Sequence, residues 1–212
     1  MLKNTLKAAV PCLAVLLSLQ ADAGEIKLKG DEIVRLNDQI SFCTINNIMN
    51  FNTAEYFSNP DKHAENLVYA AIYERFNNNG DTIEPCGESY GCVNNFQINS
   101  TLMNIFGRTL DFDSLFKTDF TSDGISYDMK TRTWKFPYAS GEQREVFRTE
   151  KVSSLDRDRI LVEGYTETDS SSLVSRCRAE LRHNPLKNNR SAYAVETLQC
   201  AAAEPLEEEP EE

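Results

Sequence analysis

The chain has 212 residues, which suits one domain of ordinary size with enough length to bury a hydrophobic core. It carries 22 Lys and Arg residues against 33 Asp and Glu residues, which gives a formal net charge of −11. An acidic chain without a stripe of basic residues is a poor candidate for binding nucleic acid or an anionic membrane surface, because both depend on clustered Lys and Arg.

Residues 1–23 have the pattern of an export signal that is cleaved near Ala23. Lys3 and Lys7 form a basic start, and an apolar run of about a dozen residues follows them. Ala21-Asp22-Ala23 places small residues around the expected cleavage point. The apolar run is too short to span a bilayer comfortably as a helix. We therefore expect a periplasmic or secreted protein without a membrane span.

The remaining chain divides into a domain and a tail. Residues 24–200 are expected to form a single α+β domain, whereas 201–212 are small, acidic and proline-containing. Such a segment cannot bury enough apolar surface to order itself, so we expect a disordered acidic tail. The alternative is that the tail is a docking peptide for a basic partner.

The first half of the domain has the apolar spacing of amphipathic helices. Positions three and four residues apart repeat over Asp31–Phe51 and again after Asn59 and Pro60, which suit a helix start. A short third helix is predicted from Asn99 to Phe106, with Gly107 just past its end. Asp111 is expected to cap one further helical turn.

The second half of the domain reads as antiparallel strands. Gly124–Tyr138 is predicted to be a β-hairpin, and the four later runs are short and separated by polar turns. Short connections favour antiparallel neighbours, because a parallel crossover needs a dozen or more residues. The four later strands are expected over 144–152, 160–168, 173–183 and 191–200.

Five cysteines remain after removal of the signal, and an oxidising compartment makes disulfides expected. Cys86 and Cys92 flank a small glycine-containing loop that closes easily. A turn centred on Asn188 and Asn189 would place Cys177 opposite Cys200 in the last hairpin. We therefore predict Cys86–Cys92 and Cys177–Cys200 bridges. Cys43, which lies on an apolar helical stripe, is then expected to be a buried and inert thiol.

Motifs for catalysis and for cofactor or metal binding are weak. His63 and His183, the only two histidines, fall in different predicted elements, so no metal site is expected. Ser114 and Lys117 fit the S-x-x-K pattern of serine acylases, and Ser122-Asp123-Gly124 and Lys130-Thr131-Arg132 resemble the two later motifs of these enzymes. All three motifs fall within about twenty residues, which is too close for a serine acylase. No phosphate or dinucleotide fingerprint is present, and no cofactor is expected. A carboxylate pair could still serve acid–base chemistry, with Glu163 and Asp128 as an example.

The hairpin over 124–138 has an aromatic stripe, because alternate strand residues point to one face. Packing of this stripe between the sheet and the helices is the ordinary interpretation. The functional alternative is a concave face that binds a ligand, since aromatic side chains with polar tips suit half-open pockets. The candidate ligand-binding residues are Tyr127, Trp134, Phe136, Tyr138 and Tyr165.

The order of helices followed by a hairpin-rich sheet resembles the NTF2-like (cystatin-like) α+β superfamily over 31–200. The segment with FGRTLDFDSLF and WKFPY, between Ile98 and Tyr138, also resembles small exported bacterial domains of unknown function. The resemblance implies N-terminal helices packed on a curved, C-terminal antiparallel sheet that forms a cone. The superfamily includes enzymes and binding domains, so the fold alone does not decide the function.

Three functions are therefore expected to compete. The first is an exported non-enzymatic binding module, of inhibitor or immunity type, that takes a protein partner or a small apolar ligand. The second is a small hydrolase or isomerase that uses carboxylates in an NTF2-like cleft. The third is an envelope-associated structural factor.

Overall fold

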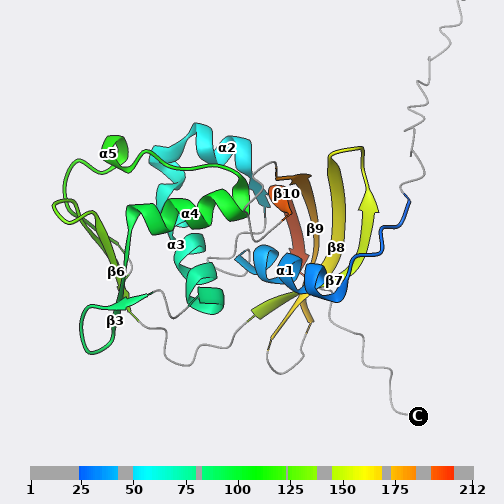
Figure 1. The fold of residues 1–212 in the computed structure, drawn as a ribbon, viewed down its shortest axis with the longest axis horizontal. Coiled ribbons are helices and arrows are strands. Elements are labelled where there is room, and N and C mark those ends of the chain that lie inside the picture. Colours follow the sequence, from blue (N-terminus) through cyan, green and yellow to red (C-terminus); the bar gives the residue numbers. More distant parts are fainter. Residues whose placement is uncertain are drawn as a thin grey trace, which may run out of the picture.

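A computed structural model describes residues 24–42, 50–79, 83–122, 124–137, 145–168, 173–184 and 192–202. The fold is α+β, with two five-stranded antiparallel sheets. The meander sheet has the strand order β1-β10-β9-β8-β7, and the hairpin sheet has the order β2-β3-β6-β5-β4. Helices α3 and α4 lie between the hairpin sheet, on the left in Figure 1, and the meander sheet, on the right.

The helices are α1 (Gly30–Ile40), α2 (Thr53–Ser58), α3 (Pro60–Asn79), α4 (Asn95–Phe106) and α5 (Phe112–Leu115). The strands of the meander sheet are β1 (Asn50–Asn52), β7 (Glu145–Ser154), β8 (Arg159–Thr168), β9 (Leu173–His183) and β10 (Tyr193–Ala202). Those of the hairpin sheet are β2 (Glu84–Pro85), β3 (Tyr90–Asn94), β4 (Phe120–Ser122), β5 (Ile125–Asp128) and β6 (Thr133–Pro137).

The predicted helices are found, with two boundary errors. Phe51 lies in β1 rather than in the first helix, because it pairs with Leu198 at the edge of the meander sheet. Helix α4 begins at Asn95, earlier than predicted, since Asn94 caps it by accepting a hydrogen bond from the backbone N–H of Gln97. Gly107 ends α4 with a φ of 65°, as its position predicted.

The predicted hairpin exists as β5 and β6, but it does not belong to the same sheet as the later strands. Strand β6 pairs instead with β3, which begins inside the small loop predicted between Cys86 and Cys92 and was not predicted as a strand. The expected single sheet was therefore wrong. The reason is the long-range pairing of β6 with β3, a strand that precedes the hairpin in the sequence. Strand β3 contains Cys92, whose predicted bridge to Cys86 is confirmed.

The four C-terminal strands form the predicted meander, and Cys200 pairs directly with Cys177. The second predicted disulfide is therefore confirmed. A β-bulge between Val195 and Thr197 leaves Glu196 without a cross-strand partner, and the register on the loop side of the bulge is shifted by one residue. Between the bulge and the loop, the pairing register therefore differs by one residue from the register that a two-residue turn at Asn188 and Asn189 predicts.

Helix α1 supplies polar side chains to both outer strands of the β7–β10 meander. Phe147 in β7 donates its backbone N–H to the Ser41 hydroxyl over 2.9 Å, just after the helix. Gln39 donates to the carbonyl oxygen of Tyr193 in β10 over 2.8 Å. Because β7 and β10 are separated by two strands, the sheet must curve around this helix, and bulges in both strands increase that curvature.

Several predictions fall on residues outside those that the structure describes. These are the signal over 1–23, the thiol of Cys43, Tyr138 at the end of the stripe and the tail from 203 onward. Ala201 and Ala202 were predicted to be part of the tail, but they extend β10. Within the described ranges, no helix is both long enough and apolar enough to cross a membrane.

Candidate functional site

Three of the predicted ligand-binding aromatics lie inside the protein. Trp134 is 0% exposed, and Tyr127 and Phe136 are also buried. Asn95 links two of them, because it accepts a hydrogen bond from Trp134 Nε1 over 2.9 Å and donates one to the Tyr127 hydroxyl over 2.9 Å. The polar atoms of Trp134 and Tyr127 therefore have a hydrogen-bond partner within the protein.

Helix α5 and the turn after it cover this aromatic stripe. The ring of Phe116 packs edge-on against Trp134, with 5.0 Å between the ring centroids, and Phe112 and Phe120 pack around the same indole. The geometry agrees with core packing, the ordinary interpretation of the stripe. Tyr165 is different, because it lies half-buried on the outer face of the meander sheet, with the guanidinium of Arg176 5.6 Å from its ring centroid.

A partly enclosed surface depression lies where the meander sheet meets the end of α4. We call it the arginine cleft; its volume is about 570 Å³. Segments far apart in the sequence build it: the start of α2, the turn after α4, and β8, β9 and β10. The charged and imidazole side chains that line it are Arg108, Arg159, Glu180, Arg182, His183 and Glu196.

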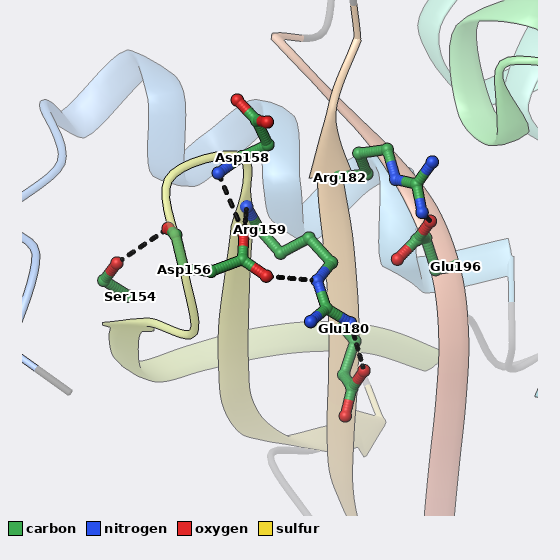
Figure 2. Close-up of polar contacts among 7 residues, drawn as sticks. All are labelled: Ser154, Asp156, Asp158, Arg159, Glu180, Arg182 and Glu196. Atoms are coloured by element: carbon green, nitrogen blue, oxygen red, sulfur yellow. Dashed lines mark hydrogen bonds and ion pairs between the residues drawn. The ribbon is translucent and has the colours of Figure 1, made fainter. Parts of the chain in front are cut away.

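Figure 2 shows two separate groups of ion pairs in and beside the cleft, one around Arg159 and one around Arg182. Arg159 Nε donates to Asp156 Oδ2 over 2.6 Å, and its Nη1 lies 3.9 Å from Glu180 Oε2. Arg182 Nη2 lies 2.6 Å from Glu196 Oε1. Glu196 is the residue without a cross-strand partner at the β10 bulge, so the bulge places this carboxylate beside the guanidinium.

The turn between β7 and β8 fixes the first of these pairs. Asp156 accepts hydrogen bonds from the backbone N–H groups of Asp158 and Arg159, each over 2.9 Å. The N–H of Asp158, followed by the Arg159 guanidinium, holds the pKa of the Asp156 carboxyl below its usual range. Asp156 in turn raises the pKa of Arg159. The pair therefore stays charged, and it fixes the position of Arg159 at the rim of the cleft.

A second and more open depression lies on the outer face of the meander sheet. Its rim contains Arg176 and Arg178 near the end of β10, and its volume is about 660 Å³. Arg176 Nη1 donates to Glu150 Oε2 over 2.5 Å. Because this depression is more open to solvent, the arginine cleft is the better candidate for a ligand site.

The residues considered for catalysis do not form a site. Asp128 lies in the hairpin sheet, where it accepts a hydrogen bond from the backbone N–H of Thr131, whereas Glu163 lies in the meander sheet, 4.0 Å from Lys151 Nζ. His63 is buried against Tyr56, with 4.0 Å between the ring centroids. In the part of the chain that the structure describes, no three His, Cys, Asp or Glu side chains are grouped as metal ligands would be.

Sequence patterns missed the arginine cleft, since its charged residues come from four segments without a shared motif. The one available signal was Gly107, which predicted the turn that carries Arg108. The two disulfides are typical of a protein that folds in an oxidising, non-cytoplasmic environment. No protein-family model, curated protein or solved structure matches this chain.

Proposed function

We propose that the protein is an exported, non-enzymatic binding module, periplasmic or secreted, and that it contacts its partner through the arginine cleft. The observation that supports this is the collection of Arg108, Arg159 and Arg182 around one depression in an otherwise acidic protein. Arginine is enriched at protein interfaces, because its planar group makes several directed hydrogen bonds at once.

The proposal includes the NTF2-like resemblance. A curved antiparallel sheet with α1 against it is the arrangement that such a cone would need, and the contacts of Gln39 and Ser41 support it. The hairpin sheet would then be an addition to that cone. In this proposal the binding surface is the charged end of the meander sheet rather than an apolar interior.

A small hydrolase or isomerase is the second candidate, and one observation favours it. Glu180 and Glu196 line the same cleft, as a pair of acid–base groups would need to do. Glu196, however, is engaged by Arg182 over 2.6 Å, and such a contact favours a structural role. Binding by the arginines therefore remains the first proposal.

A retention experiment with matched variants tests the binding function. Wild-type protein, Arg108→Gln and Arg35→Gln would be immobilised and exposed to an extract of exported proteins from the source cells. Arg35 is a suitable control, because it is exposed on α1 and does not line the cleft. We expect a partner that the wild type and the control retain and that Arg108→Gln loses. Equal retention by all three proteins would refute the cleft as the contact.

The enzymatic alternative has its own measurement. If an activity is found, replacing Glu180 or Glu196 with Gln should abolish turnover while substrate binding is kept. Unchanged turnover in both variants would exclude these two carboxylates as the acid–base pair.

A further inference from the structure

We propose that the arginine cleft is a receptor for a carboxylate group, held by the guanidinium groups of Arg108 and Arg182. This inference rests on the proposed binding function and names the chemistry that the cleft recognises. It follows from how the arginines of the cleft are already engaged. Arg159 is shared by Asp156 and Glu180, so its charge is matched within the protein.

Arg108 is the cation of the cleft that has no such match. It makes no hydrogen bond, ion pair or ring contact with any residue that the structure describes, and it is exposed to solvent at the cleft wall. An arginine that lines a depression and has no acceptor among the described residues is available to a ligand. Most other arginines near the meander sheet, in contrast, already have a carboxylate partner.

The position of Arg108 suggests an obvious structural role, namely capping the end of α4, but that role is already filled. The carbonyl oxygen of Met103 accepts from the backbone N–H of Gly107 over 3.0 Å and from Asn184 Nδ2 over 3.3 Å. Gln39 Nε2 donates to the carbonyl oxygen of Ile105 over 2.9 Å. Because other groups satisfy these carbonyls, the Arg108 guanidinium is not needed as a cap.

Gly107 directs the chain toward the cleft. Its φ of 65° is a left-handed conformation that glycine adopts readily, and a Cβ at this position would lie 3.4 Å from the Cβ of Ala194 in β10. The turn is therefore packed closely against the first residues of β10. This packing gives Arg108 a fixed starting point at the cleft wall, opposite the strand that carries Glu196.

Arg182 has hydrogen-bonding capacity left over. Glu196 engages one of its guanidinium nitrogens, Nη2, while Nε and Nη1 have no acceptor among the described residues. The side chain is 61% exposed, so these donors remain accessible. A guanidinium offers five N–H donors, which is enough for Glu196 and a second carboxylate together.

A carboxylate fits this cleft better than a phosphate does. Glu180 and Glu196 line the same depression, and their charges would repel a phosphate dianion about twice as strongly as a singly charged carboxylate. Such a carboxylate has two sources: an acidic side chain of a polypeptide, or a free small organic acid. A cleft of about 570 Å³ admits either of them.

The test is a titration of the whole mature protein, followed by backbone NMR signals and by calorimetry. Three probes would be compared at a pH at which phosphate is a dianion: a capped peptide with one glutamate, free propionate and inorganic phosphate. We expect a carboxylate probe to shift the signals of Gly107, Arg108 and His183, and the tighter of the two carboxylates identifies the source. In Arg108→Gln the dissociation constant should rise about tenfold or more, because a charge-assisted hydrogen bond is lost. In Arg35→Gln it should not change.

Three results would overturn the inference. The first is the absence of shifts at the cleft with both carboxylates at about 10 mM, a concentration at which even weak contacts are seen. The second is wild-type affinity in Arg108→Gln, and the third is phosphate binding as tight as carboxylate binding. If the retention of a partner depends on Arg108 although no carboxylate binds, the inference fails and the proposed function stands. If no partner is retained, the proposed function fails on its own experiment.

Discussion

The two disulfides should stabilise the protein unequally, because they close chain loops of different length. The Cys177–Cys200 bridge joins residues 23 positions apart, and the Cys86–Cys92 bridge joins residues 6 positions apart. In the chain-entropy treatment, a loop of the first length stabilises the folded state by about 3.4 kcal/mol and one of the second length by about 2.2 kcal/mol. The cross-strand bridge of the meander sheet is therefore expected to matter more, by about 1.2 kcal/mol.

The measurement should leave one bridge in place at a time. In a Cys43→Ala background, one protein would carry Cys86→Ala with Cys92→Ala, and the other Cys177→Ala with Cys200→Ala. Urea unfolding of each protein with and without a reductant isolates its remaining bridge without a change in side-chain volume. Reduction should cost about 3.4 kcal/mol in the first protein and about 2.2 kcal/mol in the second. The reverse order, or equal losses, would refute the loop-length reasoning.

Three further predictions concern stability. Burial, followed by the charge of Lys62, lowers the pKa of His63, so the unfolded chain binds a proton more readily, and stability should fall as the pH drops below about 6.5. The urea midpoint of His63→Phe should depend less on pH than that of the wild type, whereas His183→Phe should keep the wild-type dependence. The same pH dependence in the wild type and both variants would contradict the role given to His63. Gly164→Ala places a Cβ 2.0 Å from the carbonyl oxygen of Arg148, so the free energy of unfolding should fall by about 3 kcal/mol or more, as measured by thermal unfolding. Gly30→Ala is the control and should change stability little, because the space around Gly30 is open. Asn95→Ala leaves the Trp134 and Tyr127 polar groups unpaired, so we expect a loss of about 1–3 kcal/mol together with a shift in the emission of this single tryptophan; an unchanged spectrum and midpoint would show that the bridge contributes little.

Local patterns in the sequence predicted what depends on neighbouring residues. The stripe of α3, the left-handed end at Gly107 and the strands of the meander follow from periodicity and turn chemistry. The Cys177–Cys200 pairing was also correct, although the bulge shifts the register nearer the loop. A bulge adds one residue to one strand and leaves no clear mark on the alternation of a short segment.

What the sequence could not predict depends on contacts between distant segments. Strand β3 pairs with β6 across about forty residues, and no local signal identifies that partner. Alternation showed that Trp134 and Phe136 share a face, but it could not show that Phe116 covers it. The arginine cleft requires the end of α4 to meet the bulge of β10, so Arg108 and Arg182 become neighbours of one depression only after folding.

Helix α1 and the segments before and after it lie along the outer strands of the meander sheet. They also limit how the protein can pair with a strand of another molecule. On the open side of β7, the side chains of Ser41 and Asn37 accept hydrogen bonds from the backbone N–H groups of Phe147 and Thr149. Residues Gly24–Ile26 pair with the end of the strand, over 152–154. On the β10 side, Thr53 and Gln39 donate to the carbonyl oxygens of Val195 and Tyr193, which the short β1 does not reach. Among the described residues, these contacts already occupy several of the backbone groups along β7 and β10, so these two strands are poor templates for strand addition. The arrangement favours recognition through side chains over extension of β7 or β10 by another strand.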